Sequence, residues 1–551
     1  MIRPSVEAGQ SLSFYRTYRA PTRDRTALIE PGLTDAAATI ARNRSRAAHW
    51  DVSFAGKSLR ELRLAARREL VAAALHYTRA YRDVRTPEQS ECIVMAGHQP
   101  SLFHPGVWFK NFALNRVALP STGQEVNDHT VSDRKAATAI NLVIDNDVAS
   151  SSSIRVPTLD SVTGSVRQEA IAFDEAGGGV PYEQNRIRNR EIFDSFDVRV
   201  GRAIGPLARH PLVGRLWSFA RAAADRCENV SCAVAQARHA LEGEYGLQTL
   251  ELPLSVVCRS DSFAAFTLSV LSDLARFREI YNESIKDYRR EHAIRSRAHP
   301  VPELGIQNDW IEAPFWVYGD DTPQRRAVWV RRSGAGLEIS DLGQRTVRLA
   351  SPLGSANAAA ELASHNGPCW KLRPRALMTT MYARIILSDL FLHGIGGAKY
   401  DQLGNRIMYR FFGLLPPEMM VVSATILLPV EIPWPDCPSV TEIKRKRRDL
   451  RFAPERLASE ISLPPELLDQ KRRLLSEIPT GGNKKAWHDE LVRVNQSLES
   501  RLTDVRVDLE SQWAIAKQAT ASTAILRSRE NSFCLFEESD LLKTFDSLLL
   551  R

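Results

Sequence analysis

The sequence lacks any run of 18 apolar residues, and its first stretch, MIRPSVEAGQSLSFYRTYRAP, has no apolar segment of the kind that secretory signal peptides carry. We therefore expect neither a membrane span nor secretion. Cysteine is also sparse: the seven cysteines are widely spaced, odd in number and without a C-x-x-C pair, which argues against a disulfide framework and a zinc site. A reducing cytoplasm is the simplest location for such a chain.

Common catalytic signatures are missing as well. The sequence contains no G-x-S-x-G elbow and no H-E-x-x-H helix, so hydrolase and zinc-protease interpretations lack support. A net charge of +8 arises from 73 basic residues set against 65 acidic ones, which permits a polyanionic partner without requiring one. The chain has 551 residues. Because a single core stops growing at roughly 250 to 300 residues, we expect several domains or a large insertion.

The apolar pattern predicts a cover helix over 57–81, followed by a strand at 92–96, a helix over 107–119 and a strand at 140–147. Strand, helix and strand in this order are typical of a parallel α/β sheet, with 120–138 as a surface excursion. The segments 213–245, 262–297, 357–365 and 376–394 are predicted to be helical, and strands are expected at 311–320, 326–333, 337–342 and 420–429.

From these patterns we expect six regions. They are an N-terminal helical cover (1–90), the first half of an α/β core (91–160), a helical insertion (161–300), the second half of the core (301–430), a helical coiled-coil domain (431–530) and a tail (531–551). In 484–517 apolar residues step by three or four, close to a heptad seam, which predicts a coiled-coil hairpin or a dimer arm. The basic run 444-KRKRR-448 is either a solvated helix face or a nucleic-acid contact.

The first candidate site is the loop 97-GHQPSLFHPGVWFKN-111 between a predicted strand and a predicted helix. The helix N-terminus and the strand end face one crevice there, and free N–H groups attract phosphate at such a place. His98 and His104 could stabilise charge on a phosphate, with Lys110 as a point charge. Alternatively, His98 caps the turn and His104 packs.

The second candidate is the pair Asp145 and Asp147, which close a predicted strand on one face. Together they could hold Mg²⁺, a ribose or an amine, although strand-terminal Asp is also an ordinary turn former. Arg373 and Arg375 could clamp a phosphate or a carboxylate, or merely lie near a helix start.

The third candidate is the segment 391-FLHGIGGAKYDQLGN-405, which matches neither a Walker A loop nor G-x-G-x-x-G. Its glycines allow close backbone approach to a ligand. The segment combines Gly394, Gly396 and Gly397 with His393, Lys399, Tyr400 and Asp401.

Two of these segments carry a family resemblance. The loop 97–111 resembles the GQQ-x-G-L-F-x-G-P segment of the cysteine-adding enzymes of bacillithiol biosynthesis, and 386–425 is similar to that family's Y-V-G-G-P-G-E-I-A-Y loop and the part that follows it. His98 stands where the family has the first Gln, and His104-Pro105 stands where it has Thr-Gly. The chain therefore resembles a divergent relative of this family. The paired histidines also look like the H-x-G-H signature of class I synthetases and nucleotidylyltransferases.

The resemblance implies a Rossmann-like core of the nucleotidylyltransferase type, helical insertions and a C-terminal coiled coil that dimerises. It implies an ATP-dependent ligase, with Mg²⁺, that joins an amino-acid carboxylate, cysteine being one candidate, to an amine. Catalysis would fall to His98, His104 and Lys399. Nucleotide binding would fall to Gly97, Gln99, Lys110, Asn111, His393, Gly394, Gly396 and Gly397, and substrate binding to Asp145, Asp147, Tyr400, Asp401, Arg373 and Arg375.

We expect a small-molecule substrate, a homodimer and no nucleic-acid partner. The alternative is a dimeric scaffold that binds a nucleotide without catalysis and contacts RNA through residues 444–448.

Overall fold

The computed structural model describes residues 16–86, 91–119, 136–149, 151–430, 432, 438–458 and 461–550, so most of the excursion expected at 120–138 lies outside it. It is a mixed α/β structure that divides into two compact units. Unit 1 comprises the described residues up to Val156, Ala170–Leu427 and those from Arg529, and unit 2 comprises Pro157–Glu169 and Leu428–Ser528. Among the described helices, none is long and apolar enough to cross a membrane.

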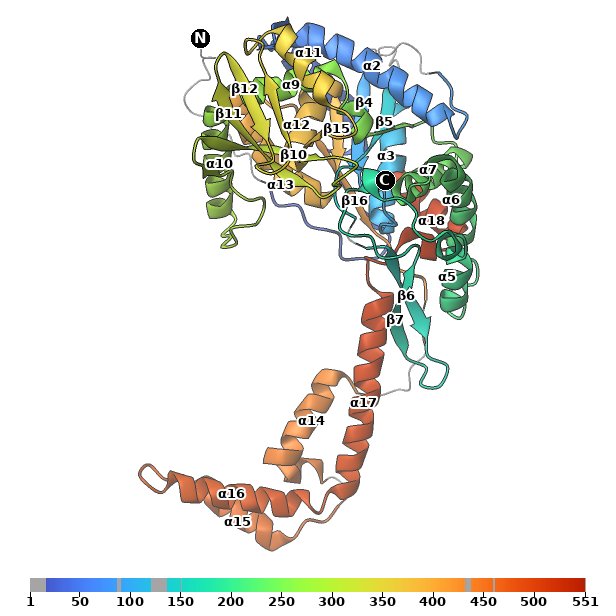
Figure 1. Ribbon diagram of the computed structural model, residues 1–551. Helices are drawn as coiled ribbons and strands as arrows, with labels where there is room; N and C mark the ends of the chain where they lie inside the picture. Colours follow the sequence, from blue (N-terminus) through green and yellow to red (C-terminus); the bar gives the residue numbers. More distant parts are fainter. Residues whose placement is uncertain are drawn as a thin grey trace, which may run out of the picture. The chain divides into compact units, whose positions relative to one another are not determined.

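Unit 1 is built around a six-stranded sheet with the order β1-β16-β15-β4-β5-β8. Figure 1 labels β16, β15, β4 and β5 of this sheet. Its strands are β1 (Thr26–Glu30), β4 (Ile93–His98), β5 (Thr138–Val143), β8 (Leu250–Pro253), β15 (Leu390–His393) and β16 (Met420–Thr425). All neighbours run parallel except β1, which is antiparallel to β16. After β4 the chain adds β5 and β8 on one side and β15 and β16 on the other. The order therefore reverses between β4 and β15.

Helices bury both faces of this sheet. On β4, Ile93 and Met95 point into a large core that includes Leu62 and Leu70, whereas Val94 and Ala96 are buried on the opposite face. The first face is covered by α2 (Leu59–Arg79), α9 (Asp261–Ser272), α12 (Ala376–Tyr382) and α13 (Ile395–Ile407), and the second by α3 (Pro105–Ala118) and α18 (Glu538–Leu549). The helices expected over 57–81 and 107–119 are thus confirmed.

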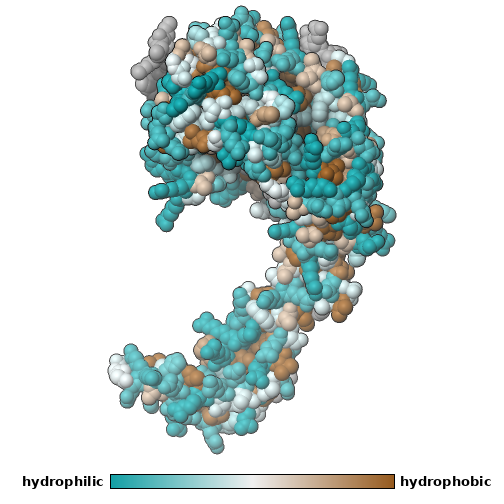
Figure 2. Space-filling view, viewed as in Figure 1, coloured by the Kyte–Doolittle hydropathy of each residue, from teal (hydrophilic) through white to brown (hydrophobic). Residues whose placement is uncertain are grey.

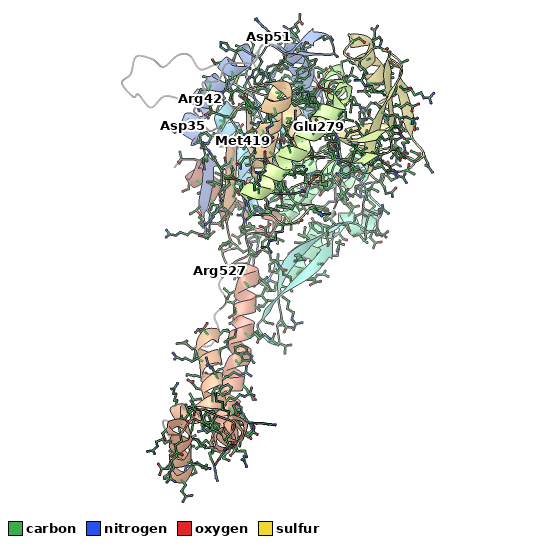
Figure 3. All side chains as sticks on the ribbon, turned by 90° about the vertical axis from the view of Figure 1, so that its left-hand side faces the viewer. Asp35, Arg42, Asp51, Glu279, Met419 and Arg527 are labelled. Atoms are coloured by element: carbon green, nitrogen blue, oxygen red, sulfur yellow. The ribbon has the colours of Figure 1, made fainter. Side chains whose placement is uncertain are left out.

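Two local features fix where these helices lie. Ser58 and Glu61 form a reciprocal capping box that starts α2. At the start of α3, a Cβ on Gly106 would lie 2.0 Å from the carbonyl oxygen of Ala424, so the helix backbone packs directly on β16. On the β1 side, Arg42 of α1 (Ala36–Ala48) lies near Met419, beside the start of β16 (Figure 3).

A second sheet of unit 1 is antiparallel, with the order β13-β12-β11-β10-β14 and β9 paired to β10. Its strands are β9 (Ile306–Gln307), β10 (Trp310–Tyr318), β11 (Arg326–Ser333), β12 (Gly336–Ser340), β13 (Thr346–Leu349) and β14 (Lys371–Pro374). Val317, Val328 and Ile339 join the same core as α2. The strands expected at 311–342 are confirmed, but they form their own sheet and do not extend the parallel one (Figure 1).

Further elements of unit 1 complete the cover. They are η1 (Leu33–Asp35), the hairpin β2 (Ser53–Phe54) and β3 (Lys57–Ser58), η2 (Tyr182–Gln184), α4 (Arg190–Asp194), α5 (Phe196–Ile204), α6 (Val213–Cys227), α7 (Val230–Glu244), α8 (Leu254–Val257), α10 (Leu274–Glu291), α11 (Ala356–His365), the π-helical turns η3 (Ala383–Leu387) and η4 (Met408–Phe412), and η6 (Phe533–Leu535). A further hairpin, β6 (Ser153–Leu159) and β7 (Val166–Ala172), begins in unit 1 and continues into unit 2.

Several predictions of helix or strand were wrong. The helix expected over 376–394 ends early, and its last part is β15, because a short buried apolar run does not distinguish strand from helix. For the same reason β8 was missed. The strand expected at 140–147 ends at Val143, and the helix expected over 213–245 is interrupted by Glu228, whose φ of 48° is left-handed. The prediction over 262–297 is likewise split into α9 and α10.

Unit 2 is helical apart from the hairpin tip. It contains α14 (Val440–Phe452), η5 (Pro454–Leu457), α15 (Pro465–Ser476), α16 (Lys484–Glu499) and α17 (Thr503–Leu526). The segment 484–517, where a heptad-like seam is expected, is divided between α16 and α17. The seam residues Val494, Leu498, Leu502 and Leu509 are buried against α14 within this unit. On the faces seen in Figure 2, hydrophilic residues predominate and hydrophobic ones are dispersed.

Candidate functional site

The candidate site lies at the carboxyl ends of β4 and β15, where the strand order reverses. In an open α/β sheet, ligands bind outside the carboxyl ends of the strands at such a reversal. Each of these two strands leads into a helix, β4 into α3 and β15 into α13. Two helix N-termini therefore start at the same edge of the sheet.

Among the described residues, no side chain caps the N-terminus of α13. Gly394 is its N-cap residue and supplies no side chain, and Gly396 and Gly397 in the first turn are exposed. The first N–H groups of a helix have no intrahelical acceptor and lie at the positive end of the helix dipole. Lys399 is exposed nearby and has no ion pair with any described residue. This combination can accept an anion such as phosphate.

Beneath this N-terminus lies a buried group of three side chains, in which Arg384 pairs with Asp401. His393 Nε2 is 2.9 Å from Asp401 Oδ2, and Arg384 Nη1 donates to the same oxygen at 2.6 Å. Thr380 donates to the other carboxylate oxygen at 2.6 Å. Burial opposes ionisation of Asp401, but Arg384 and His393 outweigh it and hold the pKa of this carboxyl below its usual range. Asp401 therefore links α13 to Thr380 of α12 and to Arg384 of η3.

His393 is buried, and burial lowers the pKa of its imidazole despite the neighbouring carboxylate, so the ring is neutral at pH 7. A Cβ on Gly397 would lie 2.9 Å from His393 Nδ1, whereas a Cβ on Gly396 would meet no atom within 4 Å. Tyr400 is half-buried with its ring against that of His299, at 5.6 Å between centroids. In the third candidate segment, Gly396, Gly397 and Lys399 are therefore the residues exposed to solvent.

The loop after β4 is more enclosed. His98 is 8% exposed, with Nε2 3.2 Å from Asn111 Oδ1 and its ring 5.1 Å from that of Phe103. Burial lowers the pKa of His98 well below its usual value. Lys110 is also buried and donates to the Gly97 carbonyl oxygen at 2.7 Å; burial lowers the pKa of its amine to about 7.

A buried network on α7 continues from Asn111. Asn111 Nδ2 and Trp108 Nε1 donate to Glu242 Oε1 at 2.7 and 2.8 Å, and Arg238 donates to the same oxygen at 2.7 Å. Arg238 also pairs with Glu251 on β8. The sequence reasoning missed these residues. The Arg-x-x-x-Glu spacing of an i,i+4 helix pair was visible, but nothing in it indicates burial.

His104 is occupied by a structural role. It is the N-cap residue of α3, and its Nδ1 accepts a hydrogen bond from the Gly106 N–H at 3.1 Å. The C-terminal segment packs on the same loop: the Phe533 N–H donates to the Phe103 carbonyl oxygen at 2.9 Å, and Arg529 Nη2 lies 3.5 Å from His104 Nε2. This contact was not predicted from the sequence, because the two segments are far apart in the chain.

Asp145 and Asp147 do not share one face, contrary to prediction, because both lie in the turn after β5. Asp145 is buried and accepts a hydrogen bond from the Ser255 N–H at 2.9 Å; burial, with Glu183 nearby, raises the pKa of its carboxyl to about 7. Asp147 is 40% exposed, pairs with Arg325 at 3.0 Å and accepts a hydrogen bond from Gln99. Among the described residues, no group of three or more potential metal ligands is assembled. Asp145 is therefore enclosed within the fold, whereas Asp147 remains accessible.

The two arginines of the segment 371–377 have different surroundings. Arg373 is buried and makes a two-bond pair with Glu183, at 2.8 and 2.9 Å. Arg375 pairs with Glu312 at 2.6 Å and stacks 4.1 Å from the Trp316 ring, whose centroid also lies 4.9 Å from the Arg325 guanidinium. Arg373 is therefore structural, whereas Arg375 is half-buried beside a partly exposed aromatic ring.

The structure thus brings Gln99 and Asp147 together, and it places Gly394, Gly396, Gly397 and Lys399 in one accessible helix start. Cavities of about 680 and 300 Å³ lie elsewhere in unit 1, the first beside β1 and α18 and the second beside residues 149–153. Comparison of the chain with models of protein families and with curated proteins found no match.

Proposed function

We propose that the chain is an ATP-using, ligase-like enzyme that activates an amino-acid carboxylate and joins it to an amine. We propose further that it is a divergent relative of the cysteine-adding enzymes of bacillithiol biosynthesis. The observation that carries the proposal is the open N-terminus of α13, with Lys399 beside it, at the point where the strand order reverses. Phosphate-bearing ligands bind at such helix starts because backbone N–H groups and the helix dipole both favour negative charge.

The strand order supports a Rossmann-like core. Numbered as they occur in the chain, the five parallel strands have the order 3-2-1-4-5, from β8 to β16. That order is typical of doubly wound sheets that bind nucleotides at the reversal. The strand order supports a Rossmann-like core independently of the sequence patterns, because two of its strands, β8 and β15, were not predicted from the sequence.

In this proposal the backbone N–H groups of Gly396 and Gly397 hold phosphate oxygens, and Lys399 neutralises charge that develops in the transition state. ATP supplies the leaving group for the carboxylate. Asp147, exposed beside Gln99, is suited to the substrate amine or, with phosphate oxygens, to Mg²⁺. Arg375 is suited to a substrate carboxylate. His98, His104 and Asp401 would position the loops around the ligand.

A second candidate function is that of a nucleotide-binding scaffold without catalysis. It is favoured by the fact that both histidines expected to act on phosphate are engaged, His98 with Asn111 and His104 as a helix cap. An RNA contact through 444–448 is less well supported. Lys444 and Arg447 of that run lie over the Trp513 ring of the same unit, so part of the run serves packing within the chain.

We also propose a homodimer with a coiled-coil contact in unit 2. The seam residues predicted for it are buried within the unit, so the contact would use apolar residues that remain exposed. Those are Phe452, Leu475, Ile478 and Val507, at 56, 49, 60 and 57% exposed. Light scattering of the full chain and of Val507→Glu/Ile478→Glu tests this: a dimer that the double substitution leaves intact contradicts it, as does a monomeric wild type.

The nucleotide site is tested with a charge at the N-cap of α13. Gly394→Asp adds a good N-cap residue, so the helix should be retained, but its carboxylate competes with phosphate for the same N–H groups. A Cβ at Gly394 meets no atom within 4 Å, which makes Gly394→Ala the matched control for size. Calorimetry with ATP and Mg²⁺ should show at least tenfold weaker binding for Gly394→Asp, about 1.4 kcal/mol, and near wild-type binding for Gly394→Ala.

Two results would contradict the site: ATP that does not bind the wild type, or ATP that binds Gly394→Asp as well as it binds the control. An assay of pyrophosphate or ADP release, run with a panel of amino acids and amine acceptors, distinguishes the ligase from the scaffold. Release above background that Lys399→Ala lowers supports the ligase. Nucleotide binding without such release supports the scaffold.

A further inference from the structure

Two cysteines meet where α6 turns into α7. Cys227 is the last residue of α6, Glu228 follows in the left-handed region, and Cys232 lies in the first turn of α7. Both are tied to the N-cap residue between them: Cys227 Sγ lies 3.7 Å from the Asn229 carbonyl oxygen, and the Cys232 N–H donates to Asn229 Oδ1 at 2.9 Å. The turn therefore links the two cysteines through Asn229, and a hydrogen bond joins their side chains, although four residues separate them in the chain.

The pair lies in a polar setting that reaches solvent. Both cysteines are half-buried, whereas Cys258 and Cys534 are buried. Gln236 Nε2 is 3.4 Å and the Tyr77 hydroxyl 3.8 Å from Cys232 Sγ. Small polar reagents can therefore reach the pair, and Cys232 is held on the inner side by donors from α2 and α7.

We propose that Cys227 and Cys232 form a modification site, a dithiol that peroxide oxidises to an intramolecular disulfide. Cys227 Sγ, as thiolate, attacks one oxygen of hydrogen peroxide; the O–O bond breaks, hydroxide leaves, and Cys227 becomes a sulfenic acid. The Cys232 thiol then attacks this sulfur, the S–O bond breaks, and water leaves with the Cys232 proton. Two thiols are oxidised and one peroxide is reduced to water.

The electrostatics of the pair support this division of roles. The hydrogen bond from Cys232 lowers the pKa of Cys227 to about 7, with the Asn229 backbone and Arg226 acting in the same direction. The same contact, together with burial, raises the pKa of Cys232, so Cys232 keeps its proton while Cys227 is a thiolate. Once Cys227 is a neutral sulfenic acid, its charge no longer opposes ionisation of Cys232.

The site is tested on the full chain with hydrogen peroxide, followed by alkylation, tryptic digestion and mass spectrometry. Both cysteines fall in one tryptic peptide, 227-CENVSCAVAQAR-238. We expect this peptide to lose two hydrogens and to resist alkylation until it is reduced. Cys369, which is exposed, is the internal control, and the experiment is repeated in Cys369→Ser to remove bonds between chains.

Single variants separate the roles. Cys232→Ser should carry sulfenic or sulfinic acid at Cys227, and Cys227→Ser should leave Cys232 reduced. Alkylation of Cys227 in the unoxidised protein should be half-maximal near pH 7, against about 8.5 for an unperturbed thiol. The proposal is overturned if peroxide oxidises Cys369 while the peptide 227–238 keeps two thiols. It is also overturned if Cys227 reaches the sulfinic acid as fast in the wild type as in Cys232→Ser.

Discussion

Removal of the Asp401 charge tests whether the ion pairs under α13 hold the site together. Asp401→Asn preserves the shape of the side chain but leaves the Arg384 guanidinium, 1% exposed, without a counter-charge. Breaking a buried pair by removing one partner costs about 3 to 5 kcal/mol, since the remaining charge stays buried. Because the folded-state pKa of Asp401 lies below the unfolded value, this contribution is present at neutral pH and is lost as the pH falls below about 4.

The measurement is hydrogen exchange of the backbone amides of β15 and α13, which reports on this unit rather than on unit 2. At 1.36 kcal/mol for each factor of ten, the expected loss corresponds to exchange faster by about 150-fold to 5,000-fold. Asp225→Asn is the control, because Asp225 pairs with Arg190 at 2.7 Å on the surface, 66% exposed. Such an exposed pair is worth less than about 1 kcal/mol.

The reasoning is refuted if Asp401→Asn accelerates exchange no more than Asp225→Asn. If Asp401→Asn does not fold, Thr380→Ala removes one hydrogen bond to the same carboxylate and should cost about 1.5 to 3 kcal/mol. The double variant Asp401→Asn/Arg384→Met should be less destabilised than Asp401→Asn alone, because it also removes the unpaired charge.

Three further predictions concern the core around the site. Gly106→Ala should destabilise unit 1 by about 1 to 3 kcal/mol in urea unfolding, because its Cβ meets the Ala424 backbone. Gly396→Ala is the control, because a Cβ there meets no atom within 4 Å. Equal stability of the two variants would contradict the packing of α3 on β16. The pKa of Lys110 is about 7 in the folded protein and about 10.4 in the unfolded chain. The free energy of unfolding of the wild type should therefore rise by about 3 to 5 kcal/mol from pH 7 to 10. Lys110→Met should abolish this rise. Asp145 has a raised pKa of about 7, so wild-type stability should fall from pH 4 to 7, and Asp145→Asn should flatten that fall; an unchanged slope would show that other groups cause it.

The sequence indicated which loops meet at the reversal of strand order, but not what their histidines do there. The loops after β4 and β15 were singled out from turn residues and histidines, and both lie at the reversal of strand order. The roles of the histidines were not readable, because whether an imidazole caps a helix, packs or faces a ligand depends on partners distant in the chain. For His104 those partners include Arg529, and for His98 they include the α7 residue Glu242, reached through Asn111.

The strands that periodicity missed have a common physical cause. β8 and β15 are four residues long and buried; β15 has strand partners on both sides, and Glu251, the polar residue of β8, pairs with Arg238 of α7. A strand of this kind shows no alternation of polar and apolar residues, since both of its faces are covered. Amphipathic elements such as α2, in contrast, were predicted correctly because one face remains in water.

The two helix N-termini at the carboxyl edge are chemically unequal, and this inequality decides which of them can serve a ligand. At α3, Pro105 carries no N–H, His104 already accepts the Gly106 N–H, and the segment around Phe533 covers the loop. At α13, the N-cap residue is a glycine, the first turn contains two exposed glycines, and Lys399 is exposed in the next turn. Helix starts attract anions only where their N–H groups remain free. The anion that we propose is therefore expected at α13 rather than at the histidine-rich loop.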